Sequence, residues 1–130
     1  MYLIDANIFL ELLFKRERWR ESYEFLKKVK DGELRGHLLQ FALHGISAAL
    51  GKPELVKTFR DITTWRGLEI LKSDIYDEIK AAEEAERAGL DFDDGLHYYY
   101  AKKLGVRLVS FDKDFDKTEI GRLEPRDALA

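Results

Sequence analysis

The sequence of 130 residues contains no cysteine, and this absence excludes several kinds of chemistry. Without thiols the chain can form neither a disulfide nor a thiolate zinc site, and it cannot use a cysteine nucleophile. A chain without cysteine also suits a reducing cytoplasm, which is where we expect the protein to be located.

Long hydrophobic runs are lacking as well. No stretch approaches the ~20 apolar residues that a membrane-spanning helix needs. The first five residues, MYLID, lead directly into an acidic side chain, without the basic region and apolar core of a signal peptide. We therefore expect a soluble, intracellular protein that makes no contact with a membrane.

An excess of positive charge is also missing, because the formal net charge is −3. Proteins that bind nucleic acids are usually basic, so this value counts mildly against that function. One segment is locally basic and contains Lys15, Arg16, Arg18, Arg20, Lys27, Lys28 and Lys30. A run of this kind is more often a solvated helix face than a phosphate-binding surface, so the second interpretation is the less favoured one.

The pattern of apolar residues predicts one α/β domain. Short apolar runs predict strands at residues 2–4, 68–71 and 106–111, and a further short strand in the tail after Arg122. Apolar residues at three- and four-residue spacing predict helices at 8–14, 16–30, 54–65, 74–89 and 92–104. Residues 38–50 form one more, mostly apolar segment. Because strands alternate with helices, the sheet should be largely parallel.

Acidic residues stand where the predicted strands end. Asp5 follows the first strand, and Asp112 and Asp114 follow the strand at 106–111. In a parallel α/β sheet, ligands bind beyond the carboxyl ends of the strands, so these acids should meet at one edge. Asp94, at the start of a predicted helix, is a further candidate, because the N-terminus of a helix favours negative charge.

A cluster of carboxylates favours a hard divalent cation. Neighbouring carboxylates repel one another, and Mg²⁺ prefers oxygen ligands while leaving room for water and substrate phosphates. Such an ion can activate water and neutralise the charge on a phosphodiester during hydrolysis. Each acidic element taken alone is more often a turn or a helix cap, and only their combination favours a catalytic site.

Three motifs in this order resemble the PIN-domain family, and within it the VapC-type toxin ribonucleases. The first is the opening segment 2–7 (YLIDAN), and the second is 92–97 (FDDGLH), followed by Tyr100-Ala101 and Gly105. The third is 108–115 (LVSFDKDF), in which Ser110 stands in the place of a more usual threonine. The resemblance covers nearly the whole chain.

The resemblance implies a single PIN-like domain over residues 1–130, folded as a three-layer α/β/α sandwich with a central, mostly parallel sheet. It further implies endonucleolytic cleavage of RNA with Mg²⁺ or Mn²⁺, a homodimer, and inhibition by a small antitoxin protein. The roles that it implies are catalysis by Asp5, Asp94 and Asp112, metal binding by these three and Asp114, and substrate binding by Asn7 and Ser110.

One position departs from the family pattern. The third helix of the family normally has a Glu, but His44 stands at the matching position, and no acid occurs between Arg35 and Lys52. His44 is either a replacement ligand, which would suit Mn²⁺, Fe²⁺ or Zn²⁺ better than Mg²⁺, or a partly buried histidine bonded to a backbone group. We favour the second interpretation at this stage.

Several alternatives to a nuclease are open. A PIN-fold binding module that lost its activity together with the missing Glu is the main one. A haloacid-dehalogenase type of phosphotransferase would need a second acid where Asn7 stands, so it is disfavoured. A receiver domain would need paired acids after the first strand and an Asp closing a middle strand, and neither pattern is clear in the sequence.

Overall fold

Four short strands form one parallel sheet in the computed structural model, which describes residues 1–130. The strands are β1 (Tyr2–Ile4), β2 (Gly36–Leu39), β3 (Leu68–Leu71) and β4 (Arg107–Val109), in the spatial order β3-β2-β1-β4. Leu3 is aligned with His37 on one side and with Leu108 on the other. The carboxyl ends of β1 and β4 therefore lie side by side, and the backbone N–H of Asp5 donates to the carbonyl of Val109 (3.0 Å).

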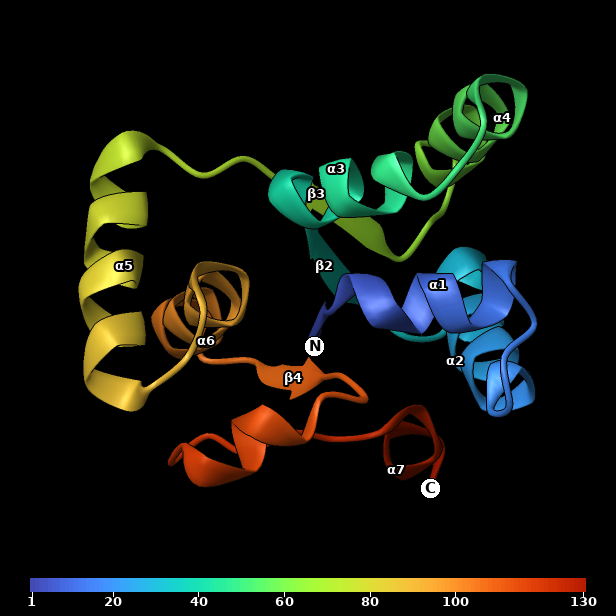
Figure 1. Cartoon of the computed structure of the whole chain (residues 1–130). Coiled ribbons are helices and arrows are strands. Elements are labelled where there is room, and N and C mark those ends of the chain that lie inside the picture. The colour runs from blue at the N-terminus through green and yellow to red at the C-terminus, as the bar shows by residue number, and fades with distance from the viewer.

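Helices cover both faces of this sheet. They are α1 (Ala6–Leu13), α2 (Trp19–Asp31), α3 (Gln40–Ala48), α4 (Lys52–Ile62), α5 (Ile75–Ala88), α6 (Phe92–Leu104) and α7 (Pro125–Leu129), with a 3₁₀ turn η1 at Lys113–Lys117. Figure 1 shows α5 and α6 on one side of the strands and α1 and α2 on the other. The predicted three-layer α/β/α architecture with a parallel sheet is thus confirmed. No helix has the length and apolar character needed to cross a membrane.

The core between the layers is apolar, and its polar members are concentrated in one place. Only six polar or charged residues are buried, and four of them (Asp5, Asp94, His97 and Ser110) are linked through contacts or electrostatic coupling. Burying polar groups without partners is costly, so their concentration in one part of a small core indicates a candidate functional site there.

Two details differ from the sequence-based expectation. Residues 36–39 form strand β2, which was not predicted, because the strand passes directly into α3 without a turn residue between them. The expected strand after Arg122 is reduced to a single parallel bridge between Leu123 and Val109, and α7 follows it. The chain turns into α7 because Pro125 occupies the first position of this helix and Glu124 with Asp127 forms a capping box.

Candidate active site

Asp5 lies at the junction of β1 and α1, where it is 5% exposed. Its Oδ2 accepts a hydrogen bond from the hydroxyl of Ser110 (2.6 Å), which is fully buried just after β4. The same hydroxyl accepts bonds from the backbone N–H of Asp112 (2.9 Å) and from Nδ2 of Asn7 (3.2 Å). Asn7 in turn accepts from the N–H of Phe111 (3.2 Å). Asn7 and Ser110 therefore hold the ends of β1 and β4 together.

Asp94 reaches the same region from the first turn of α6. The carboxylate of Asp91 caps this helix by accepting from the N–H of Asp94 (2.8 Å). The helix packs closely on α5, because a Cβ atom at Gly95 would lie 2.4 Å from the Cβ of Ala85. Only glycine permits this approach, and Asp94 itself is left 5% exposed.

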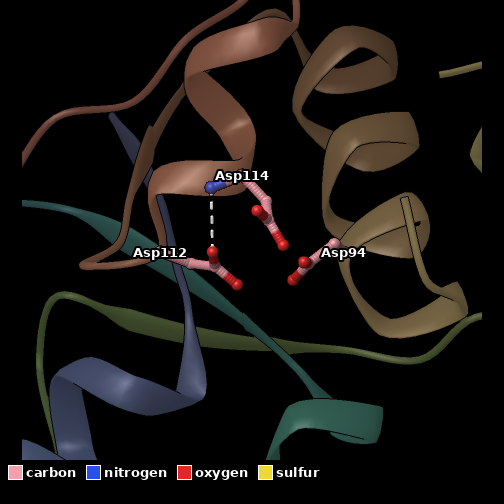
Figure 2. Close-up of side chains that lie close together, drawn as sticks. All are labelled: Asp94, Asp112 and Asp114. Carbon is pink, nitrogen blue, oxygen red and sulfur yellow. Dashed lines mark hydrogen bonds between the residues drawn. The ribbon is translucent and has the colours of Figure 1, made fainter. Parts of the chain in front are cut away.

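Asp112 and Asp114 complete a group of three carboxylates. Asp112 caps η1 by accepting from the N–H of Asp114 (2.9 Å). Figure 2 shows both side chains directed toward that of Asp94 across the gap between η1 and α6. One oxygen atom from each of the three lies within 4.8 Å of the others, close enough to ligate one ion.

The electrostatics of Asp94 reflect this crowding. Burial raises the pKa of its carboxyl to about 8, and the negative charges of Asp112, Asp91 and Asp5 contribute to the increase. A carboxyl group with such a pKa lacks a positive neighbour, and a bound cation would supply one. Asp5 is therefore coupled to Asp94 by its charge, although it does not belong to the group of three whose oxygen atoms meet.

His97 is a site residue to which the sequence analysis gave no role. Its ring is fully buried one turn after Asp93, with Nδ1 2.9 Å from the carbonyl oxygen of Asp93 and 3.2 Å from its carboxylate. Nε2 lies 3.9 Å from Oδ1 of Asp5 and has no hydrogen-bond partner. Burial alone would lower the pKa of His97, but Asp5 and Asp93 outweigh it and raise this pKa to about 9.

His97 and Asp5 form a buried contact between an imidazole and a carboxyl group. Burial raises the pKa of Asp5, whereas His97 and the hydrogen bond from Ser110 act in the opposite direction. His97 stands at the helical spacing i+3 from Asp94, and this spacing was the one signal that could have placed it in the site.

His44 lies on α3 outside the group of three acids. Its side chain is exposed and makes no hydrogen bond, so the interpretation of a partly buried histidine bonded to a backbone group is wrong. The residue instead lines a separate surface cavity of about 250 Å³ together with Phe41, Lys72 and Glu78. No other residue of α3 supplies an acid in its place.

The model of the PIN domain family matches residues 2–121, and the chain therefore belongs to this family, whose members are nucleases. No curated protein matches the chain in sequence.

Solved structures with the same fold include two that are described as a toxin or a toxin–antitoxin complex. VapC20 of Mycobacterium tuberculosis, described as a toxin that cleaves the sarcin–ricin loop, has a TM-score of 0.77 at 16% identity, over 96% of this chain and 100% of that one. A toxin–antitoxin complex from Klebsiella pneumoniae has a TM-score of 0.73 at 17% identity, covering 96% and 98% of the two chains. VapBC2 of Rickettsia felis, bound to a DNA fragment from its promoter, has a TM-score of 0.64 at 21% identity, covering 95% and 96%.

Proposed function

We propose that the protein is a metal-dependent endoribonuclease that hydrolyses phosphodiester bonds of RNA, and that it is the toxin of a toxin–antitoxin pair. The observation that carries this proposal is the convergence of Asp94, Asp112 and Asp114, combined with the raised pKa of Asp94. Membership of a nuclease family supports hydrolysis, and the toxins that share the fold support the biological role.

The residues present fit a hard divalent cation. The three acids offer only oxygen atoms, and no thiolate is available in the chain to favour a softer metal. These acids would hold Mg²⁺ or Mn²⁺ and would leave room at the ion for water and phosphate. When bound, such an ion supplies an activated water and neutralises charge on the phosphodiester.

The residues of the chain divide into two groups with different tasks. Asp94, Asp112 and Asp114 would hold the cation at the open edge of the sheet. Asp5 adds negative charge behind Asp94, and Ser110 with His97 keeps Asp5 in a fixed position. We assign Ser110 a positioning role rather than a contact with substrate, because it is fully buried. Asn7 is half-buried and remains a candidate for contact with the RNA.

The decisive experiment is cleavage of an end-labelled single-stranded RNA pool with Mg²⁺, with Mn²⁺ or with EDTA. The wild type should cleave with a metal and be inert with EDTA, and Asp94→Asn should be inert throughout. Asp61→Asn is a matched control, because Asp61 is an exposed acid of α4 whose side chain makes no ion pair or hydrogen bond. Cleavage that survives both EDTA and Asp94→Asn would refute the proposal.

A second candidate function is a PIN-fold binding module without activity. It is favoured by one observation, the absence of any acid on α3, where the exposed His44 stands. This module would still bind Mn²⁺ and RNA but would not cleave. Mn²⁺ binding measured by calorimetry on the same samples separates the two functions, because only the nuclease shows metal binding together with cleavage.

The partners that we propose are a small antitoxin and a second copy of the chain. The Klebsiella structure with the same fold is described as a toxin–antitoxin complex. For a homodimer, the start of α5 offers a candidate surface, since Ile75, Tyr76 and Ile79 are 63%, 74% and 49% exposed. We expect the protein to act in the cytoplasm, where its RNA substrates are. Light scattering after size exclusion would report a dimer, and Tyr76→Glu should then yield monomers.

A further inference from the structure

The turn between α1 and α2 has an unusual surface that the proposed active site does not use. Two aromatic and three basic side chains gather there, and we call them the aromatic–basic turn. They are Phe14, Lys15, Arg16, Trp19 and Arg20. Arg16 lies over the ring of Phe14 (5.4 Å from guanidinium carbon to centroid), and Trp19 has Arg20 at 4.9 Å and Lys15 at 5.8 Å. Phe14 is 45% exposed, and the three basic residues are exposed.

The cations of this turn are free of acidic partners. Lys15, Arg16 and Arg20 take part in no ion pair, whereas the neighbouring Arg18 is held by Glu21 and Glu124 at 2.8 Å each. Glu17 is the one acid inside the turn that is likewise unpaired. In a chain with a net charge of −3, three unpaired cations beside two aromatic rings are a local concentration of positive charge.

The backbone at Lys15 supplies an independent observation. Helix α1 ends in a Schellman motif, in which the N–H of Arg16 donates to the carbonyl of Glu11 and that of Lys15 to Leu12. This motif requires a left-handed residue, and Lys15 adopts it with φ = 45°. The helices α2, α5 and α6 all end in glycine at a left-handed position. Lys15, by contrast, is the single non-glycine residue of the chain with positive φ.

A strained lysine where glycine would be relaxed suggests that its side chain is kept for a function. Its ammonium group lies beside Trp19, within the aromatic–basic turn. The left-handed backbone and an unpaired charge therefore coincide at Lys15, although one is a property of the backbone and the other of the side chain.

We propose that the aromatic–basic turn binds single-stranded RNA outside the acid cluster, with bases stacked on Trp19 and Phe14 and phosphates bound by Lys15, Arg16 and Arg20. Flat rings flanked by cations are the combination that binds single strands without sequence preference. Exposed cation–π contacts are weak, so the cations can turn from the rings to phosphates when bases arrive. The proposal rests on the proposed function in taking RNA as the ligand.

The position of the turn suits an extension of the active site. Helix α1 begins directly after Asp5 and spans its eight residues over about 12 Å, and the aromatic–basic turn follows its last residue. In Figure 1, α1 runs from the centre of the molecule to the edge where it turns into α2. A strand with its scissile phosphate at the acids would need only a few more nucleotides to reach Trp19.

The test measures binding in EDTA, by fluorescence anisotropy of a labelled single-stranded RNA, so that no cleavage is required. Trp19→Leu and Phe14→Leu keep an apolar side chain but remove the flat ring. Trp19→Leu should weaken binding at least about fivefold, the loss expected for one stacked base. Three further variants, Lys15→Gln, Arg16→Gln and Arg20→Gln, each remove one cation. Each should reduce the slope of log Kd against the logarithm of the salt concentration by ~0.7, the value for one phosphate contact on a single strand. Lys80→Gln, an exposed unpaired lysine of α5, is the control and should change neither quantity.

Lys15→Gly gives the sharpest result, because two measurements should move in opposite directions. Glycine relieves the left-handed strain, so the melting temperature should rise, while RNA binding should weaken as in Lys15→Gln. A folding defect cannot produce this combination. Lys15→Arg should restore RNA binding.

Cleavage separates this proposal from the proposed function. With Mn²⁺, the variants should raise KM for a long RNA and leave the rate on a trinucleotide unchanged, because a trinucleotide fills the acid cluster alone. If no RNA is cut but the anisotropy results hold, the nuclease function fails and the RNA surface stands. If all the variants have the affinity and the salt dependence of the wild type, the aromatic–basic turn does not bind RNA and the proposal is wrong.

Discussion

The hydroxyl of Ser110 donates a hydrogen bond of 2.6 Å to the carboxylate of Asp5, and this bond joins residues 105 positions apart in the sequence. Because Ser110 also accepts from Asn7 and from the backbone of Asp112, one side chain connects the acid that follows β1 with the acid that follows β4. The candidate active site is therefore held together by a neutral residue behind it.

Replacing Ser110 by alanine should weaken both the fold and the site. The change leaves Asp5 without its hydroxyl donor and the N–H of Asp112 without an acceptor, and position 110 itself is fully buried. We expect a loss of about 1–3 kcal/mol in the free energy of unfolding, measured with urea. Ser110→Thr keeps the hydroxyl and should keep Mn²⁺ affinity. Equal loss of Mn²⁺ affinity in both variants would show that packing matters rather than the hydroxyl.

Asp94 should make the metal-free protein less stable as the pH rises. The pKa of Asp94 is about 8 in the folded protein, against an ordinary value of 3.8 that applies to the unfolded chain. Between these pH values the folded protein therefore binds more protons than the unfolded one. Stability therefore falls from about pH 4 to about pH 8. Asp94→Asn should remove this part of the pH dependence in EDTA and melt at a higher temperature near pH 8. Added Mn²⁺ should stabilise the wild type and not the variant. A variant that melts below the wild type at pH 8 would contradict the assignment.

Local sequence patterns predict many elements of this fold, and the elements that they fail to predict depend on tertiary packing. Residues 68–71 and 92–104 were predicted as strand and helix, because clear turn or cap residues bound them. Strand β2 was missed, since an apolar run that continues into α3 has no local sign of the change.

The residues of the site likewise divide into those that the sequence predicts and those that only the structure reveals. The positions of Asp5 and Asp112 follow from parallel strands that end at one edge, so the sequence was sufficient to predict them. His97 is different, because a histidine among the buried residues of α6 looks like any satisfied core histidine until the fold brings Asp5 to 3.9 Å from it. Likewise, only the structure shows that Asp5 is turned toward Ser110 and His97 and is not one of the three acids whose oxygen atoms lie within 4.8 Å of one another.

Glu124 should stabilise the protein at neutral pH and cease to do so in acid. Its carboxylate accepts hydrogen bonds from Arg18 (2.8 Å) and Arg122 (2.9 Å), and these bonds lower its pKa to about 2 from 4.5. The stabilisation is complete above pH 4.5 and is lost as the pH falls toward 2. Glu124→Gln should cost about 1–3 kcal/mol at pH 7 and nothing near pH 2. Glu86→Gln, at an exposed acid of α5 without an ion pair, is the control for melting curves over this range.

His97 should contribute stability that depends on its charge. Its folded-state pKa of about 9 lies above the ordinary 6.5, so the contribution is complete below pH 6.5 and is lost as the pH rises through 9. His97→Leu keeps the volume of the core but leaves Asp5 with no cation nearby. The difference in melting temperature between wild type and variant should be largest near pH 6 and should shrink above pH 9. A difference that stays constant with pH would mean that the ring acts by packing alone.

His44→Glu tests whether the departure from the family pattern limits activity with Mg²⁺. A carboxylate at this position would add a hard oxygen ligand and one more negative charge, neither of which neutral imidazole supplies. Because His44 is exposed, the substitution buries no charge and should leave the free energy of unfolding in EDTA within about 0.5 kcal/mol of the wild-type value. The wild type should cleave RNA faster with Mn²⁺ than with Mg²⁺, and His44→Glu should gain rate mainly with Mg²⁺.

Ser47→Glu is the matched control for that gain, because it adds the same charge one turn further along α3. A gain of rate in both variants would show a general effect of charge rather than a ligand. No gain in either variant, with stability unchanged, would mean that position 44 lies out of reach of the cation. Asp94, Asp112 and Asp114 would then have to supply every protein ligand by themselves, and the preference for Mn²⁺ should disappear.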